Sequence, residues 1–280
     1  MRRAKPLLGT LVSIETVDAG DEADTAIAQA FARVDALHRA MSFHEAGSDL
    51  RRLARSRPGE RVEVTPGTHA VLALALQLEQ RSGGAFNACC AAELVRRGRL
   101  PRPGDALPAA AASLEAGIEL LDDGRVHIRQ TPWIDLGGIA KGFAVDLAVE
   151  ALRAAGATSA CVNAGGDLRA FGSRELLVQV RDPQQPSRAW PVAEIRDLAC
   201  ASSAWTLDGG ASKTSHLVGV PPDCSDNAIA SVTVFADACA AADALTKIVW
   251  ALGPAQALPL LRSYQAEAFI CHRDGTGSRL

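Results

Sequence analysis

The sequence predicts a mixed α/β (α+β) protein in which strands and helices alternate along 280 residues. The clearest observation is the stretch 133–169, where an extended run, a Gly-Gly turn, a helix, a strand and a second Gly-Gly turn follow one another. Elsewhere, apolar residues recur at helical spacing in some segments and alternate with polar ones in others. Because neither a repeat nor a linker divides the chain, we expect one domain over residues 1–280.

The first third of the chain carries one strand pattern and three helical patterns. Residues 11–16 alternate as a strand does, and residues 24–41 place their apolar side chains on one helical face. Ser48 is a good N-cap for a short helix. Residues 68–81 predict a third helix, which ends at a Ser-Gly-Gly turn.

The middle of the chain predicts a loop, a hairpin and an extended run. Residues 97–108 contain three prolines and two glycines, which is typical of a surface loop. Residues 118–121 and 126–128 flank an Asp-Gly turn and predict a β-hairpin. Residues 134–136 resemble the end of a strand.

The helix predicted from residue 140 onward has an unusual lysine in its first turn. The partial positive charge of a helix start disfavours the Lys141 cation by about 0.3–1 kcal/mol. A bound anion would reverse that sign, because free N–H groups beside a lysine form a phosphate cradle. A solvated lysine is the alternative interpretation.

The last third of the chain predicts further strands and one long helix. The helix is expected at residues 239–252 and ends at a Gly-Pro pair. The expected strands span residues 176–180, 198–202, 216–220, 230–234 and 266–271.

Composition and missing motifs exclude several functional classes. With a net charge of −3 and only 4% aromatic residues, the chain lacks the basic and stacking surface of a nucleic-acid-binding protein. The sequence contains neither G-x-G-x-x-G nor G-x-x-x-x-G-K-[ST], which disfavours dinucleotide-binding and P-loop folds. The G-x-S-x-G elbow of many serine hydrolases is absent too.

The cysteines and the N-terminus predict a reducing, cytoplasmic location. Seven scattered cysteines without a C-x-x-C pair are typical of buried, reduced thiols. The N-terminus has no apolar run of the kind found in secretory signals, and no apolar stretch is long enough to cross a membrane. We therefore expect a cytoplasmic protein without a membrane segment.

Ordered motifs along nearly the whole chain closely resemble those of the ApbE family, the FAD:protein FMN transferases. They are LLGTLVSI, MSFHEAGSDLRRL, SGGAFN, IDLGGIAKGFAVD, VNAGGDLRAFG, KTSHLV and SVTVFADACAAADALTKIVWALG. The resemblance implies a T-fold-related protein of two packed lobes of mixed sheet and helices, with FAD in the cleft between them. It also implies an enzyme that transfers FMN from FAD to a Ser or Thr hydroxyl of an acceptor protein, releases AMP, and uses Mg²⁺ at the pyrophosphate.

The resemblance also assigns site residues by position. Expected cofactor contacts are Leu8, His44, Ala85, Phe86, Asn87, Asp135, Lys141 and Leu217. Expected metal ligands are the carbonyl of Gly138, the carboxylate of Asp243 and the side chain at position 247. Expected catalytic residues are His216 and Asp243. Asp167 would brace the site or only close the second Gly-Gly turn.

This chain departs from the family pattern at several of these positions. Leu8 replaces a usual methionine, His44 a tyrosine and Asn87 an aspartate. Gly219 replaces an aspartate, so an acid–base role in that segment rests on His216 alone. These departures leave three hypotheses: the flavin transferase, an FAD pyrophosphatase that gives FMN and AMP, and a non-catalytic FAD-binding protein.

The most consequential departure is at position 247, where the family usually has a threonine metal ligand. Here the residue is Lys247, four residues after Asp243. That spacing is also typical of a helical ion pair worth about 0.2–0.5 kcal/mol. Alternatively, the ammonium would take over part of the metal's electrostatic role while repelling a divalent cation.

Overall fold

The structure, a computed structural model, describes residues 1–18, 20–104, 110–173, 175–182, 187–204 and 229–280. Contacts divide the chain into two compact units. Unit 1 contains residues 1–34 and 141–280, and unit 2 contains residues 35–140. The expectation of a single domain stays a prediction.

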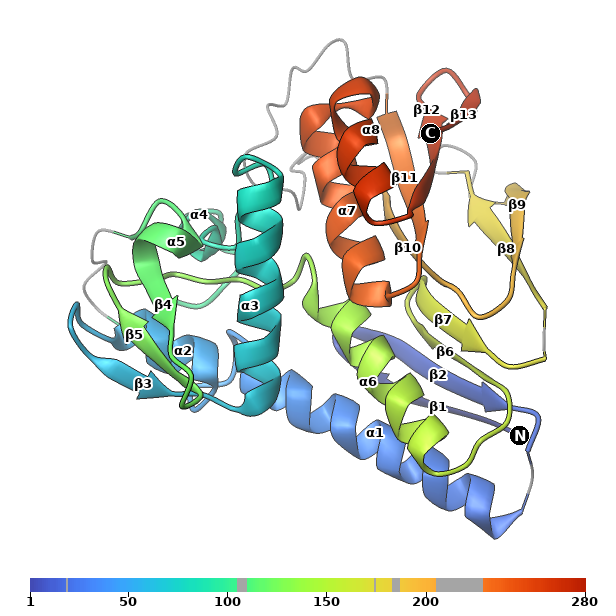
Figure 1. The fold of residues 1–280 in the computed structure, drawn as a ribbon, viewed down its shortest axis with the longest axis horizontal. Coiled ribbons are helices and arrows are strands. Elements are labelled where there is room, and N and C mark those ends of the chain that lie inside the picture. Colours follow the sequence, from blue (N-terminus) through green and yellow to red (C-terminus); the bar gives the residue numbers. More distant parts are fainter. Residues whose placement is uncertain (19, 105–109, 174, 183–186, 205–228) are drawn as a thin grey trace. The chain divides into compact units, whose positions relative to one another are not determined.

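Unit 1 is built on an antiparallel eight-stranded sheet (Figure 1). Across the sheet the strands are β1 (Arg2–Leu7), β2 (Thr10–Thr16), β6 (Ala160–Ala164), β7 (Asp167–Phe171), β10 (Ala199–Ala204), β11 (Ile229–Ala236), β12 (Glu267–His272) and β13 (Gly277–Arg279). Short turns join β1 to β2, β6 to β7 and β12 to β13, and the strand order brings the two Gly-containing hairpin turns of β1–β2 and β6–β7 to one end of the sheet.

Helices and a separate hairpin cover the sheet of unit 1. The helices are the first part of α1 (Asp21–Met41), α6 (Ala140–Ala154), α7 (Cys239–Leu252) and α8 (Pro254–Ser263). Helix α7 packs on β10 and β11. The hairpin of β8 (Leu176–Arg181) and β9 (Ala189–Ile195) packs its apolar residues against Leu168, Cys200 and Phe235 of the sheet. Strand β11 is buried along its whole length, as expected for a strand covered on both faces.

Unit 2 combines a small antiparallel sheet with short helices. Its remaining elements are α2 (Asp49–Arg55), β3 (Arg61–Glu63), α3 (Pro66–Arg81), α4 (Ala91–Arg96), α5 (Leu114–Gly117), β4 (Ile118–Leu120) and β5 (Arg125–Ile128). The strand order is β3-β5-β4. The Ser48 hydroxyl accepts a hydrogen bond from the Arg51 N–H at 3.2 Å, which confirms the predicted N-cap of α2.

The strand end predicted at residues 134–136 is wrong. This run forms neither helix nor strand, and it pairs with no strand among the described residues. Instead, the Asp135 N–H donates to the Ala88 carbonyl at 2.9 Å, and the Ala91 N–H donates to the Trp133 carbonyl at 3.1 Å. The buried side chains of Trp133, Ile134 and Leu136 belong to the core of unit 2, which explains their strand-like sequence. The strand predicted at residues 216–220 lies outside the described residues.

Candidate active site

Helices α6 and α7 begin against each other, and an aspartate from each helix caps the other. Asp146 of α6 accepts hydrogen bonds from the N–H groups of Cys239 and Ala240 at 2.9 Å each. In return, Asp243 of α7 accepts a hydrogen bond from the Gly142 N–H at 3.2 Å. A carboxylate at a helix start satisfies unpaired N–H groups and matches the local partial positive charge. The two caps fix how the helix starts face each other.

The crossing of these helix starts depends on Gly142. A Cβ atom at this position would lie 2.3 Å from the Cys239 carbonyl oxygen and 2.8 Å from the Ala240 Cα. Real Cβ atoms do not approach main-chain atoms so closely, so only glycine fits here without displacing α7. The close crossing brings the side chains of the first turns of α6 and α7 within contact distance.

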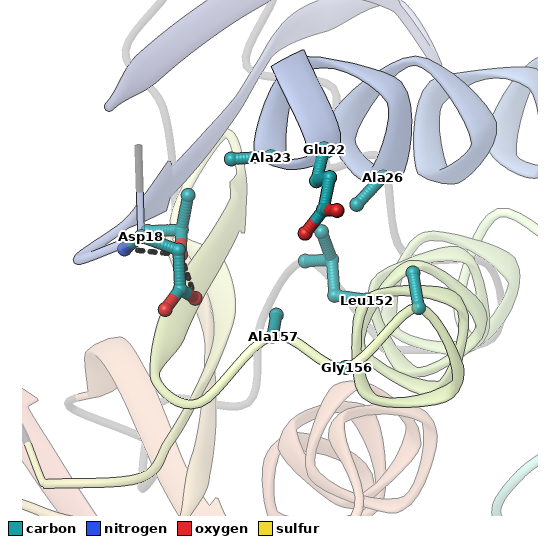
Figure 2. A pocket seen from close by; sticks show the side chains of 9 residues that line it. Asp18, Glu22, Ala23, Ala26, Leu152, Gly156 and Ala157 are labelled. Atoms are coloured by element: carbon teal, nitrogen blue, oxygen red, sulfur yellow. Dashed lines mark hydrogen bonds between the residues drawn. The ribbon is translucent and has the colours of Figure 1, made fainter. Parts of the chain in front are cut away.

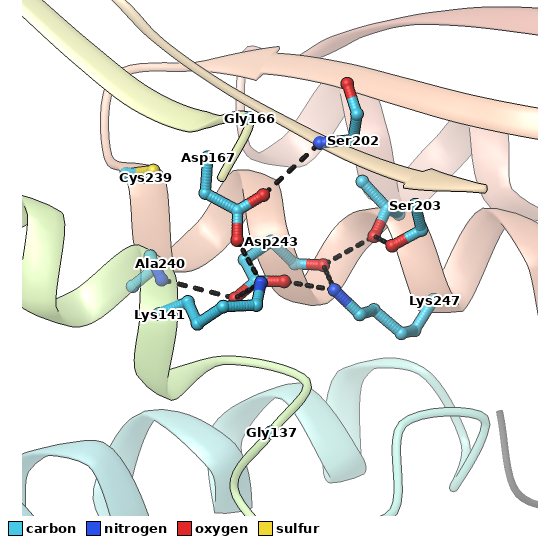
Figure 3. Close-up of polar contacts among 12 residues, drawn as sticks. Gly137, Lys141, Gly166, Asp167, Ser202, Ser203, Cys239, Ala240, Asp243 and Lys247 are labelled. Carbon is cyan, nitrogen blue, oxygen red and sulfur yellow. Dashed lines mark hydrogen bonds and ion pairs between the residues drawn. The ribbon is translucent and has the colours of Figure 1, made fainter. Parts of the chain in front are cut away.

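Four charged residues form what we term the charge cluster: Lys141, Asp167, Asp243 and Lys247 (Figure 3). Lys141 donates a hydrogen bond to Asp167 Oδ2, and its Nζ lies 3.7 Å from Asp243 Oδ2. Lys247 donates to Asp243 Oδ1 and, at 2.9 Å, to the Asp243 carbonyl oxygen. The Asp243 side chain is 0% exposed and that of Asp167 is 2% exposed, whereas that of Lys141 is 34% exposed.

Burial and pairing set the protonation of the cluster. Burial raises the pKa of Asp167, the Asp243 carboxylate raises it further, and the two lysines oppose the shift only in part. Burial acts in the same direction on Asp243, but Lys247 and Lys141 outweigh it and lower the pKa of that carboxyl. Burial lowers the pKa of Lys141, yet the carboxylates of Asp243 and Asp167 raise it above the ordinary lysine value. Lys141 is therefore a permanent, partly exposed cation at neutral pH.

Two tight hairpin turns lie beside the charge cluster. Gly165 and Gly166 join β6 to β7 directly before Asp167, with φ angles of 68° and 104°. A Cβ atom at Gly165 would lie 2.4 Å from Thr10 Oγ1, so this turn closely approaches the start of β2. Leu8 and Gly9 form the neighbouring turn of β1–β2, and Leu8 has a φ of 56°. A leucine in this left-handed region is strained, which is common at binding sites.

Unit 2 carries a second set of predicted site residues. Burial raises the pKa of Asp135. Two weaker effects oppose this shift: the Gly137 N–H donates a hydrogen bond to the carboxylate at 3.1 Å, and His44 lies nearby. Phe86 is buried, and Asn87 is fixed by hydrogen bonds to the Ala112 carbonyl at 2.7 Å and from the Cys89 N–H at 2.8 Å. Ala85 precedes this pair, and Gly138 follows Gly137 shortly before α6.

The sequence model that describes the ApbE family matches residues 8–270 of this chain. The chain belongs to the ApbE family. A Treponema pallidum (strain Nichols) relative named FAD:protein FMN transferase is 28% identical over 303 residues, covering 94% of this chain and 81% of its own length. A Rhodobacter capsulatus relative of the same name is 30% identical over 260 residues, covering 85% of this chain. The match spans 49% of that relative, about half of its length.

Solved structures confirm the fold that the sequence predicts for this ApbE-family chain. The crystal structure of the apo flavinyl transferase ApbE from Pseudomonas stutzeri superposes with a TM-score of 0.79 at 22% identity. The match covers 100% of this chain and 94% of that chain. At this level of identity the likeness bears on the fold alone.

The cluster does not fit the divalent cation that family membership implies. Asp243 Oδ1 accepts a hydrogen bond from Lys247, while Oδ2 accepts one from Gly142 and faces Lys141. A divalent ion would meet two ammonium groups at the Asp243 carboxylate, its expected ligand, and like charges at such range repel by several kcal/mol. Among the described residues, no three His, Cys, Asp or Glu side chains are grouped to hold a metal ion.

Several residues of the site were predicted and others were missed. The structure brings Lys141, Asp167, Asp243 and Lys247 together, whereas His216 and Leu217 lie outside the described residues. No sequence pattern indicated the capping role of Asp146. Asp146 lies on the same helical face as Glu150 and Arg153, which are exposed, and only its contact with the start of α7 distinguishes it.

A separate pocket lies at the other end of α6 (Figure 2). Its volume is about 250 Å³, and it is lined by the start of α1, including Glu22 and Ala23, and by Leu152 and Gly156. Asp18 at its edge accepts hydrogen bonds from the Thr158 N–H at 3.0 Å and the Thr158 hydroxyl at 2.9 Å. This carboxylate therefore serves a structural role.

No helix in the described part of the chain is long and apolar enough to span a membrane.

Proposed function

We propose that this ApbE-family chain transfers FMN from FAD to a Ser or Thr hydroxyl of an acceptor protein and releases AMP. The observation that carries the proposal is Lys141, a partly exposed ammonium held between the buried carboxylates of Asp167 and Asp243. Beside it lie the Leu8-Gly9 and Gly165-Gly166 turns, which let the main chain approach a ligand closely. This arrangement suits recognition of a diphosphate by a fixed positive charge.

The proposed reaction exchanges one phosphoester bond for another. The hydroxyl oxygen of the acceptor attacks the phosphorus on the FMN side of FAD, and its proton passes to a base. The bond from that phosphorus to the bridging oxygen breaks, and AMP leaves with the bridging oxygen. Negative charge grows on this oxygen in the transition state, where a preorganised cation such as Lys141 stabilises it.

The remaining roles follow the family pattern and stay predictions. His216 would accept the hydroxyl proton, since it is the one acid–base group in its segment that the resemblance retains. FAD contacts are expected at Leu8, His44, Ala85, Phe86, Asn87, Asp135, Lys141 and Leu217. Magnesium also belonged to the family pattern, but the cluster does not fit it, so no step proposed here uses a metal. A cytoplasmic location also stays a prediction.

Product analysis separates this function from its two alternatives. The purified chain is incubated with FAD and with an extract of the cells that contain it, and the products are resolved by chromatography and by denaturing gel with flavin fluorescence. The transferase gives AMP and a fluorescent protein band. An FAD pyrophosphatase gives AMP and free FMN, and a flavin-binding protein leaves FAD intact. His216→Ala is expected to abolish AMP release while FAD still binds, and Lys5→Ala, on exposed β1, serves as the control.

A further inference from the structure

Lys247 is held more tightly than a surface lysine in a helical ion pair. Its Nζ donates to two oxygens of one residue, the Oδ1 and the carbonyl oxygen of Asp243, and its side chain is only 18% exposed. The Asp243 side chain is 0% exposed. A carboxylate buried to this degree needs a partner charge, because an unpaired buried charge is strongly destabilising. Lys247 supplies that partner.

The Asp243 carboxylate has other polar partners besides Lys247. Asp243 Oδ2 accepts the Gly142 N–H at 3.2 Å and faces the Lys141 ammonium at 3.7 Å. The neighbouring threonine does not offer its hydroxyl either. Thr246 Oγ1 donates to the Asp243 carbonyl oxygen at 2.7 Å and shares a 2.8 Å hydrogen bond with Ser203 Oγ. The carboxylate and carbonyl oxygens of Asp243 and the hydroxyl of Thr246 are therefore already engaged.

We propose that the Lys247 ammonium is a built-in replacement for a divalent metal at Asp243, so that this chain binds the diphosphate of FAD without a metal ion. The inference rests on the proposed function for the identity of the diphosphate. In this chain two lysines would neutralise the charge of the site. Lys141 faces the ligand directly, and Lys247 keeps Asp243 paired and the helix starts in place.

The first test measures metal binding without FAD. Magnesium is titrated calorimetrically into the apo chain, into Lys247→Thr, which removes the ammonium and adds a hydroxyl, and into Lys5→Thr as a control for losing a lysine. Lys247→Thr is expected to bind Mg²⁺ at least about tenfold more tightly than the parent chain, which corresponds to about 1.4 kcal/mol. The control is expected to match the parent. If Lys247→Thr gains no Mg²⁺ affinity, the proposal is overturned.

The second test uses the unmodified chain and so does not depend on any variant folding. FAD affinity is measured in EDTA and in excess Mg²⁺, and it is expected to differ by less than about twofold. Lys247→Arg, which keeps a cation, should behave in the same way. A tenfold or greater loss of FAD affinity on chelation overturns the inference while the proposed function stands. If FAD binds in neither buffer, the proposed function fails, and the magnesium titration still decides the role of Lys247.

Discussion

Asp146 and Asp243 each accept main-chain hydrogen bonds at the start of the other residue's helix. Each carboxylate also forms an ion pair, Asp146 with Arg169 at 2.7 Å and Asp243 with Lys247. Both ion pairs therefore lie at the crossing of α6 and α7. The same crossing positions Lys141, which belongs to the first turn of α6. We infer that the geometry of the charge cluster depends on residues that would not touch a ligand.

Replacing Asp146 with alanine should destabilise the protein strongly. The change leaves the N–H groups of Cys239 and Ala240 and the Arg169 guanidinium without their buried acceptor. We expect a loss of about 3–5 kcal/mol in the free energy of unfolding, measured by urea denaturation. Glu150→Ala, at an exposed position on the same helix, should stay within about 0.5 kcal/mol of the parent. Similar stabilities for both variants would refute the capping role.

Gly142→Ala should push α6 and α7 apart. The added methyl would overlap the main chain of Cys239 and Ala240, which cannot move without shifting the start of α7. Overpacking of this kind destabilises a protein by about 1–3 kcal/mol or more. Gly47→Ala, where a Cβ meets no atom within 4 Å and φ is not positive, is the matched control. A variant that melts at the parent temperature would contradict the close crossing seen here.

The sequence predicted many elements well because local patterns determine them. The bounds of α7 at residues 239–252 were predicted correctly, and Ser48 caps α2 as expected. Strand β9 and helix α8 were missed. Strand β9 includes Pro191, and its apolar residues are buried only through tertiary contacts, with β8 and with the large sheet of unit 1. Helix α8 carries an internal proline, Pro259, which local rules count against a helix.

The site was predictable only where one segment contained both partners. The Asp243–Lys247 pair follows from the four-residue helical spacing and is confirmed, although its burial was not foreseen. The Lys141–Asp167 pair joins helix α6 to strand β7. Asp167 is therefore the partner of the lysine whose charge is unfavourable at a helix start. The sequence suggested a phosphate for that role, because long-range pairing between a helix and a hairpin leaves no local signal.

Lys141→Ala should weaken FAD binding and also destabilise the apo protein. The change leaves the buried Asp167 without its closest cation, so we expect a loss of about 1–3 kcal/mol at neutral pH, since the lysine is partly exposed. Without Lys141, the pKa of Asp167 in the folded protein rises further above 3.8, which is the ordinary pKa of an aspartate in an unfolded chain. The difference from the parent should therefore shrink as the pH falls toward 3.8, because the raised pKa then leaves Asp167 protonated in the folded form of both proteins. Chemical denaturation between pH 4 and pH 7 measures this, and a difference that grows at low pH would contradict it.

Asp135→Asn should stabilise the apo protein at neutral pH. Burial raises the pKa of Asp135 above 3.8, so its ionised form opposes folding above that pH, whereas asparagine still accepts the Gly137 N–H. The gain in the free energy of unfolding should vanish as the pH falls below 3.8. Asp123→Asn is a control of opposite sign, because hydrogen bonds to Arg125 lower the pKa of Asp123. Equal pH profiles for the two variants would refute the assignment. We also expect Asp135→Asn to bind FAD more weakly, which calorimetry measures.

The central claim, that FMN moves from FAD to an acceptor protein, is tested most directly by following each phosphorus of FAD. Two preparations are incubated with the chain and an acceptor-containing extract, one labelled at the phosphorus on the FMN side and one at the phosphorus on the AMP side. The account predicts that the FMN-side label becomes covalently bound to protein and that the AMP-side label is recovered in AMP, in equal amounts. Recovery of the FMN-side label only as free FMN, or of the AMP-side label on protein, would contradict it.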